Sequence, residues 1–385
     1  MNDYENSFLF LLKTHINNEK LPDGYRFDVG RVFSLAEIHN VLPMIYVVTE
    51  EASEDVLMYK MKAKNSVFYQ MMKNTLFSNL YNKIIEKSIE VIVLKGIICS
   101  SAYPTPDYRL SSDFDIVVKE KDRSSLHDFL LSEGFFCKGD NYLDESTGLY
   151  IEVSTSLGEG DGWIKDTAER VFDGFFDRCI SVDGFRTLSH TDHFVYLIYH
   201  AFKHFIGSGF GVRQIIDIFL FVKKYNAYID YERSKEMLSE MNAFSFACNI
   251  FLLIEKYFDY IFDGFDYKND QSALCPDDFL ADLLSAGVFG KSSEDRLHSA
   301  SLVLSAVNDN GKKSFFKTAF PSYKIMKSKF AVLKYLPFLL PVMWIYRLLV
   351  YSVKLAGKKK NISPVRSIKI AESRIELLKT MGIIK

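Results

Sequence analysis

Short runs of β-branched residues interrupt a chain in which the other segments have apolar residues three to four positions apart, as in helices. Residues 91–94 form one such run and are followed by a Lys-Gly pair at 95–96. This is the pattern of a buried strand that enters a turn. Residues 113–118 and 150–154 have the pattern of two further strands, and the helical segment 123–133 lies between them. This interleaving of strands with helices predicts an α/β (α+β) core.

The segments on both sides of this core are helical in pattern. A helix is predicted at 191–205, with Ser189 as its N-cap and Gly207 just after its end. Further helices are predicted at 212–225, 231–241, 243–262 and 278–305. The chain is thus expected to have four parts: a helical N-terminal region (1–88), the α/β core (89–188), a helical domain that forms the other wall of a cleft (189–311), and a basic, aromatic-rich C-terminal region (312–385).

Charge is unevenly distributed along the chain. The 385 residues hold 47 Lys and Arg against 49 Asp and Glu, yet residues 312–385 contain 17 basic residues and only two acids. The balanced total, with 15% aromatic residues, indicates a foldable globular chain and argues against a protein that coats nucleic acid. The five cysteines are widely spaced without a C-x-x-C pair, so neither a disulfide framework nor a zinc knuckle is indicated.

Three interpretations of the basic region 312–385 stay open. It forms a helical hairpin that packs residues 335–351 on the body, or it lies on an anionic membrane surface, or it contacts nucleic acid. No apolar run in the sequence approaches the ~18 residues that span a bilayer, and the N-terminus lacks the basic segment of a signal peptide. We therefore expect a cytoplasmic protein, with peripheral attachment to the inner membrane surface as the alternative.

Two aspartates make the predicted strand at 113–118 a candidate metal site. Asp113 and Asp115 are two positions apart, so strand geometry places both carboxylates on one face and Phe114 on the other. Glu152 lies on a later strand, between two β-branched residues. Carboxylates from neighbouring strands suit a pair of Mg²⁺ ions, which is the arrangement that two-metal phosphoryl transfer needs.

Basic groups near these acids are candidates for holding phosphate. Lys95 and Gly96 lie at the predicted strand-to-helix turn, where backbone N–H groups and an ammonium would face a polyphosphate. Arg109, four residues before Asp113, would bind the same anion through its guanidinium.

Three residues on the predicted helices have both functional and structural interpretations. His200 and His204 share one helical face. Three interpretations are open: the pair lines the cleft beside phosphate or acceptor, it packs in the core, or it binds zinc, for which no third ligand is evident. Arg213 lies four residues before Asp217, the spacing of a simple intrahelical ion pair. We expect a structural role for Asp217 and leave the role of Arg213 open.

The order of these motifs resembles the bacterial uncharacterised nucleotidyltransferase family, which belongs to the DNA polymerase beta-like nucleotidyltransferase superfamily. The matching motifs are V-L-K-G at 93–96, Y-P-x-P-x-x-R at 103–109, D-x-D at 113–115, I-E-V-S at 151–154, L-S-H-x-D at 188–192, H-x-x-x-H at 200–204 and R-x-x-x-D at 213–217. The resemblance is densest over residues 90–220. Two positions depart from the family pattern, since Glu152 replaces an aspartate and Ser154 replaces a histidine.

The resemblance implies a small mixed sheet with flanking helices and a Mg²⁺-dependent enzyme with two ions, for which Mn²⁺ is a substitute. It implies transfer of a nucleoside monophosphate from an NTP, expected to be ATP, to an acceptor hydroxyl, with release of pyrophosphate. Asp113, Asp115 and Glu152 would hold the metals. The nucleotide would be held by Lys95, Gly96 and Arg109, with His200, His204 and Arg213 as further candidates.

Two alternatives to this enzyme remain open. A catalytically degenerate protein that binds nucleotide or acts as a scaffold is motivated by the departures at Glu152 and Ser154. A toxin-like nucleotidyltransferase that modifies tRNA or protein is the other.

Overall fold

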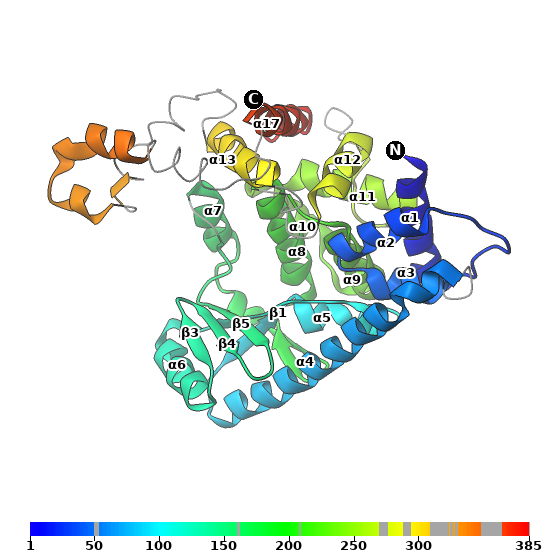
Figure 1. Cartoon of the computed structure of the whole chain (residues 1–385). Coiled ribbons are helices and arrows are strands. Elements are labelled where there is room, and N and C mark those ends of the chain that lie inside the picture. The colour runs from blue at the N-terminus through cyan, green and yellow to red at the C-terminus, as the bar shows by residue number, and fades with distance from the viewer. Residues whose placement is uncertain are drawn as a thin grey trace.

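A small mixed sheet with flanking helices forms the centre of the computed structural model (Figure 1). The structure describes residues 1–49, 54–159, 162–207, 209–268, 276–287, 294–308, 323, 326–327, 330–347 and 364–384. The strands are β1 (Val91–Leu94), β2 (Phe114–Val118), β3 (Phe136–Lys138), β4 (Asn141–Asp144) and β5 (Leu149–Ser154). Their order is β1-β2-β5-β4-β3, with β2 parallel to β5 and the other neighbours antiparallel. The α/β (α+β) prediction is confirmed, and β3 and β4 are additional strands.

The two faces of the sheet differ because acidic and apolar side chains alternate over residues 113–116, at the start of β2. On one face, helices α4 (Lys60–Glu86) and α6 (Arg123–Ser132) cover the sheet, and Phe77 of α4 stacks on Phe114 with ring centroids 4.2 Å apart (Figure 1). Full burial of a phenylalanine contributes about 1.5–3 kcal/mol. On the other face of β2, Val117 packs in the core of the helical body, and Asp115 points toward the cavity.

The remaining long helices pack around one apolar core on the far side of the sheet from α6 (Figure 1). They are α1 (Asp3–Ile16), α2 (Val29–Ile38), α3 (Leu42–Thr49), α8 (His190–Ile206), α9 (Val212–Tyr225), α10 (Tyr231–Glu240), α11 (Phe244–Phe258), α12 (Pro276–Ala286), α13 (Glu294–Asn308) and α17 (Pro364–Thr380). Shorter elements are α5 (Gly96–Ser100), α7 (Trp163–Val171), the strand pair β6 (Ile180–Val182) and β7 (Phe185–Thr187), and the 3₁₀ turns η1 (Glu54–Tyr59), η2 (Pro106–Tyr108), η3 (Glu120–Asp122), η4 (Phe175–Arg178), η5 (Asn226–Tyr228), η7 (Ala331–Lys334) and η8 (Pro337–Leu339).

Most predicted helix limits agree with the structure, and two differ for a local reason. Ser189 caps α8, with its hydroxyl accepting a hydrogen bond from the Asp192 N–H at 3.1 Å. The helix predicted at 243–262 ends at Phe258, because Asp259 has a left-handed backbone with φ of 52°. The helix predicted at 278–305 is two helices, since Gly287 follows α12 with φ of 68° and α13 begins at Glu294.

The C-terminal helix α17 packs against α13 and joins the helical body. Arg374, which is 2% exposed, donates to the carbonyl oxygens of Phe205 and Gly207 at the end of α8. Packing of residues 335–351 on the body is one of the three interpretations of the basic region; over 335–347 it is not seen at Tyr335 and Phe338, which are 83% and 73% exposed. Residues 309–322 and 348–363, which carry much of the basic sequence, lie outside the described residues. Of the helices built from described residues, none has both the length and the apolar character to cross a membrane.

Candidate active site

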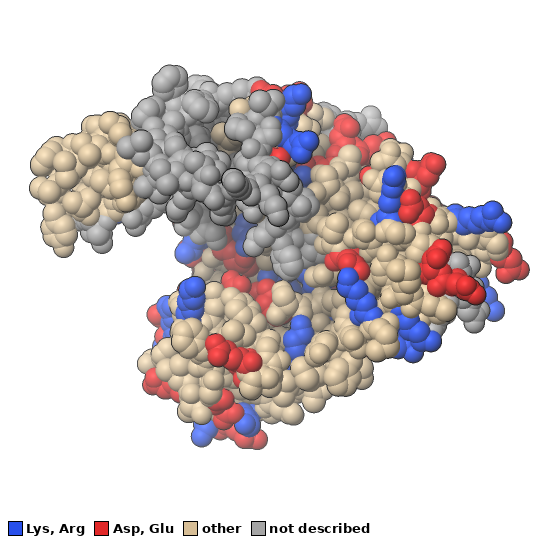
Figure 2. Space-filling model, viewed as in Figure 1, with Lys and Arg blue, Asp and Glu red and all other residues tan. Residues whose placement is uncertain are grey.

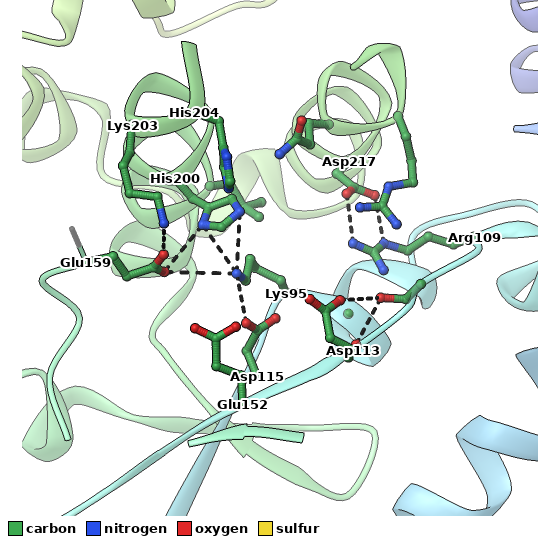
Figure 3. Close-up of a pocket in the computed structure, with 15 residues that line it drawn as sticks. Lys95, Arg109, Asp113, Asp115, Glu152, Glu159, His200, Lys203, His204 and Asp217 are labelled. Atoms are coloured by element: carbon green, nitrogen blue, oxygen red, sulfur yellow. Dashed lines mark hydrogen bonds and ion pairs between the residues drawn. The ribbon is translucent and has the colours of Figure 1, made fainter. Parts of the chain in front are cut away.

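The structure brings all nine predicted site residues to one cavity of about 290 Å³. They are Lys95, Gly96, Arg109, Asp113, Asp115, Glu152, His200, His204 and Arg213. The acids come from the sheet and the histidines from α8, which faces them across the cavity (Figure 3). Figure 2 shows side chains of both charges in the hollow between the sheet and the helical body.

Three carboxylates converge on the floor of this cavity. Asp115 and Glu152 are register partners on the parallel strands β2 and β5, and Asp113 directly precedes β2. One oxygen from each of the three lies within 4.8 Å of the others. Burial raises the pKa of Asp115 to about 6 and also raises the pKa of Glu152, although the nearby Lys95 ammonium opposes both shifts. Oxygen ligands at this spacing fit a hard divalent cation such as Mg²⁺.

Lys95 lies at a strained turn between β1 and α5. Its φ of 43° is in the left-handed region, which costs a residue other than glycine about 1–3 kcal/mol. Its ammonium lies 3.1 Å from Asp115 Oδ1 and 3.3 Å from His200 Nδ1 (Figure 3). Its backbone N–H donates to His193 Nε2 at 3.3 Å, so the turn offers the ammonium of Lys95 to the cavity rather than this N–H.

His193 and His39 are buried histidines that hold the fold together as neutral rings. His193 accepts from Lys95 N, and His39 accepts from Val212 N at 3.2 Å through Nδ1 while its Nε2 faces Leu284 O at 3.3 Å. Burial lowers the pKa of His39 to about 4 and that of His193 to about 3. These rings therefore stay neutral in the folded protein well below pH 6.5.

We expect the protein to lose stability in mild acid. Below pH 6.5 His39 and His193 become protonated in the unfolded chain but stay neutral in the folded protein. Their contribution to the free energy of unfolding is therefore complete above pH 6.5, and it falls as the pH drops toward 4 and 3. The loss is about 1.4 kcal/mol per histidine per pH unit, or about 3 kcal/mol for the pair between pH 7.5 and 5.5. Urea unfolding at the two pH values measures it. His39→Gln, which keeps a donor and an acceptor, should reduce the difference by about 1.4 kcal/mol, because burial also lowers the pKa of His15, His200 and His204 and these rings still contribute. Equal stability at both pH values would contradict the prediction.

Glu159 is a site residue that the sequence did not reveal. It lies in the loop after β5, and its carboxylate contacts Lys203, His200 Nδ1 at 3.3 Å, the Tyr196 hydroxyl and, at 4.0 Å, the Lys95 ammonium (Figure 3). Although burial opposes it, the neighbouring His200, Lys95 and Lys203 hold the pKa of Glu159 well below its usual range. Glu159 lies between two glycines in a segment without periodic apolar residues, so the sequence does not indicate that its side chain enters the cavity.

Arg109 belongs to a buried network with α9. Its Nε and Nη2 each donate to a different oxygen of Asp217 at 2.8 Å, and the Tyr103 hydroxyl donates to Asp217 at 2.7 Å. Asp217 thus pairs with Arg109 rather than with Arg213 on its own helix, and Arg213 donates to the Leu110 carbonyl. The structural role expected for Asp217 is seen, and the intrahelical pair is wrong. Nη1 is the Arg109 donor that has no partner among the described residues.

The zinc interpretation of the histidine pair is not supported. His200 and His204 lie edge to face with ring centroids 4.5 Å apart. Among the described residues, the group of three or more His, Cys, Asp or Glu side chains that lie close enough to share an ion is Asp113, Asp115 and Glu152. The two histidines instead line the cavity opposite these acids.

Comparison with known proteins places this cavity in a family. The family model described as "Uncharacterised nucleotidyltransferase" matches residues 25–259, more than half of the chain. The chain belongs to this family. The match begins before α2 and ends just after α11, so every element that lines the cavity belongs to the part shared with the uncharacterised nucleotidyltransferase family.

The predicted family resemblance is therefore confirmed, and with it a general assignment to nucleotidyl transfer, with an NTP and an acceptor as substrates. A comparison with curated proteins finds no match. Among solved structures, the solution structure of the antibiotic-resistance factor ANT(2'')-Ia is similar at 13% identity, covering 48% of this chain and 97% of that one, with a TM-score of 0.31.

Proposed function

We propose that this member of the uncharacterised nucleotidyltransferase family is a Mg²⁺-dependent enzyme. It moves a nucleoside monophosphate from an NTP, with ATP as the expected nucleotide, to a hydroxyl of an acceptor and releases pyrophosphate. The observation that carries this proposal is the convergence of Asp113, Asp115 and Glu152 within 4.8 Å, opposite basic groups on the other cavity wall. Two ions are proposed, with Mn²⁺ as a substitute for Mg²⁺.

Six residues of the cavity have a proposed place in this reaction. Asp113, Asp115 and Glu152 hold the divalent ions, which when bound neutralise the triphosphate and polarise the α-phosphate. Lys95 binds the triphosphate with its ammonium, and His200 and Lys203 line the same wall. A bond forms between the acceptor oxygen and the α-phosphorus, the bond from that phosphorus to the oxygen bridging to the β-phosphate breaks, and pyrophosphate leaves. Glu152, on the exposed side of β5, accepts the hydroxyl proton.

Transfer of label from NTPs tests this function. The full chain is incubated with α-³²P-labelled NTPs, Mg²⁺ and a cell extract, and the fraction that takes up label is isolated. We expect label in an acceptor, matched by pyrophosphate release, and loss of both when EDTA is added. Absence of label and of pyrophosphate with all four NTPs, in the presence of Mg²⁺ or Mn²⁺, would overturn the proposal.

A catalytically degenerate nucleotide-binding protein is the second candidate. The Lys95 ammonium 3.1 Å from Asp115 supplies positive charge where an enzyme of this kind uses a metal, which favours this alternative. Calorimetry with NTP and Mg²⁺ alongside the turnover assay separates the two. Binding without any product in the labelling experiment would favour the degenerate protein.

We expect Lys95→Met to weaken nucleotide binding. The change removes one charge-assisted contact with the triphosphate, worth about 1.5–3 kcal/mol, so KM for the NTP should rise about 10- to 100-fold with a smaller change in kcat. Steady-state pyrophosphate release measures both constants. Lys119→Met is the matched control, because Lys119 pairs with Glu90 and does not line the cavity. An unchanged KM for Lys95→Met would remove Lys95 from the triphosphate site.

A further inference from the structure

The outer face of α4, with the η1 turn that precedes it, is apolar and exposed. Six large apolar residues on it are between 49% and 79% exposed: Leu57, Met58, Met61, Phe68, Tyr69 and Met71. The opposite face of the same helix packs on the sheet through Phe77.

Most of these apolar positions, though not Tyr69, are paired in sequence about one point on the helix, midway between Lys64 and Asn65; Leu57 and Met58 lie on η1, directly before α4. Met61 and Phe68 lie equally far from that point on either side, as do Met58 and Met71, and Leu57 and the half-buried Met72. Two antiparallel copies of the helix that cross at this point would bring each of these residues against its counterpart. Such a self-complementary face is what a two-fold interface between identical chains requires.

The size of the face also fits an interface. At about 200 Å² for each large side chain, the six residues expose about 700 Å². A stable interface buries about 800 Å² per partner, and the largest apolar patch of a monomer is usually about 300–600 Å².

The charges beside the face favour a protein partner over an anionic membrane. Lys62 is paired with Glu37 at 2.5 Å, and Lys73 is turned inward to the Ser111 carbonyl, so that Lys64, beside the symmetry point, is the exposed lysine nearest the centre of the face. Lipid headgroups would therefore meet fewer available cations than the lysine-rich sequence of α4 suggests. Asn65 lies beside the symmetry point, where two copies of its amide are able to hydrogen-bond to each other.

We propose that the protein forms a two-fold symmetric homodimer through the outer face of α4, over residues 57–72, with the two helices antiparallel. The inner face of this helix holds the loop that carries the first metal ligand: Gln70 Oε1 accepts from Ser111 N at 2.7 Å, and Asn74 Nδ2 donates to Asp107 Oδ1 at 3.0 Å. Dimer formation thus braces a helix that positions Asp113. This proposal does not depend on the proposed function.

Light scattering coupled to size-exclusion chromatography of the full chain tests the dimer. We expect a mass of twice 44.4 kDa at micromolar concentration. Phe68→Glu places two charges in the apolar interface and should give the monomer mass with an unchanged circular dichroism spectrum, because Phe68 is 64% exposed in the monomer. Phe136→Glu is the matched control, since Phe136 is 62% exposed on β3, away from α4, and this variant should stay dimeric.

Cross-linking adds a positional test. Asn65→Cys should couple to its own copy with a short bismaleimide, whereas Phe136→Cys should not. A wild-type monomer at 50 μM, or a dimer that survives Phe68→Glu, would overturn the proposal. Binding of the monomer to vesicles with phosphatidylserine, lost in Phe68→Glu, would overturn it in favour of a lipid surface.

Discussion

Asp113→Asn combined with Asp115→Asn is expected to lower the rate of pyrophosphate release on the order of 10³-fold or more. Each amide keeps the volume of the side chain and removes one negative charge, so the cluster that lies within 4.8 Å loses two of its three anionic ligands. A site that stabilises charge developing on a transferred phosphoryl group loses about 10²–10³-fold for a single such group.

A second readout separates the loss of metal from a failure to fold. Calorimetric titration with Mn²⁺ should show binding to the wild-type protein and none to the double variant, at equal circular dichroism. Asp128→Asn is the matched control, because Asp128 is exposed on α6, on the opposite face of the sheet. Unchanged turnover in the double variant would end the assignment of these aspartates to the metal site.

Asp217→Ala is expected to destabilise the protein by about 3–5 kcal/mol. Asp217 is 4% exposed, and its two oxygens neutralise the buried guanidinium of Arg109 at 2.8 Å. Removing one member of a buried ion pair leaves the other charge without compensation in a medium that solvates it poorly. The free energy of unfolding in urea measures the effect.

The control for this change is an ion pair at the surface. Arg170 and Glu240 form a 2.7 Å pair with side chains 64% and 47% exposed, and Glu240→Gln should change stability by less than about 1 kcal/mol. Replacing both buried partners, as in Arg109→Met with Asp217→Leu, should recover part of the loss, because the Arg109 guanidinium is no longer buried without its carboxylate, although the buried Arg213 still loses the nearby Asp217 charge. A cost for Asp217→Ala as small as for Glu240→Gln would contradict the argument.

The parts of the site that the sequence predicted are those with local patterns. Asp113 and Asp115 were placed on one side of a strand by the period of two, and the structure pairs Asp115 with Glu152 on the parallel neighbour. The helix that carries His200 was predicted from its N-cap and its apolar spacing, and it begins at His190, directly after the predicted N-cap. These features depend on residues close together in the chain.

Features that depend on distant residues were missed or assigned to the wrong partner. Arg109 meets Asp217 across 108 positions, so spacing alone suggested the nearer Arg213 as the partner. Glu159 is placed by a loop, and the residues that hold its carboxylate lie on α8 and at Lys95. Strands β3 and β4 are short and mostly not buried, so they lack the apolar alternation that predicts a strand. The four-part division of the chain stays a prediction.

The contact of Arg374 with the end of α8 changes how the basic C-terminal sequence is understood. Because α17 returns to α13 and to the Phe205 and Gly207 carbonyls, the sequence between Asn308 and Pro364 starts and finishes on the same helical body. Loss of α17 would therefore remove the Arg374 donors from the Phe205 and Gly207 carbonyls, at the end of the helix that carries His200.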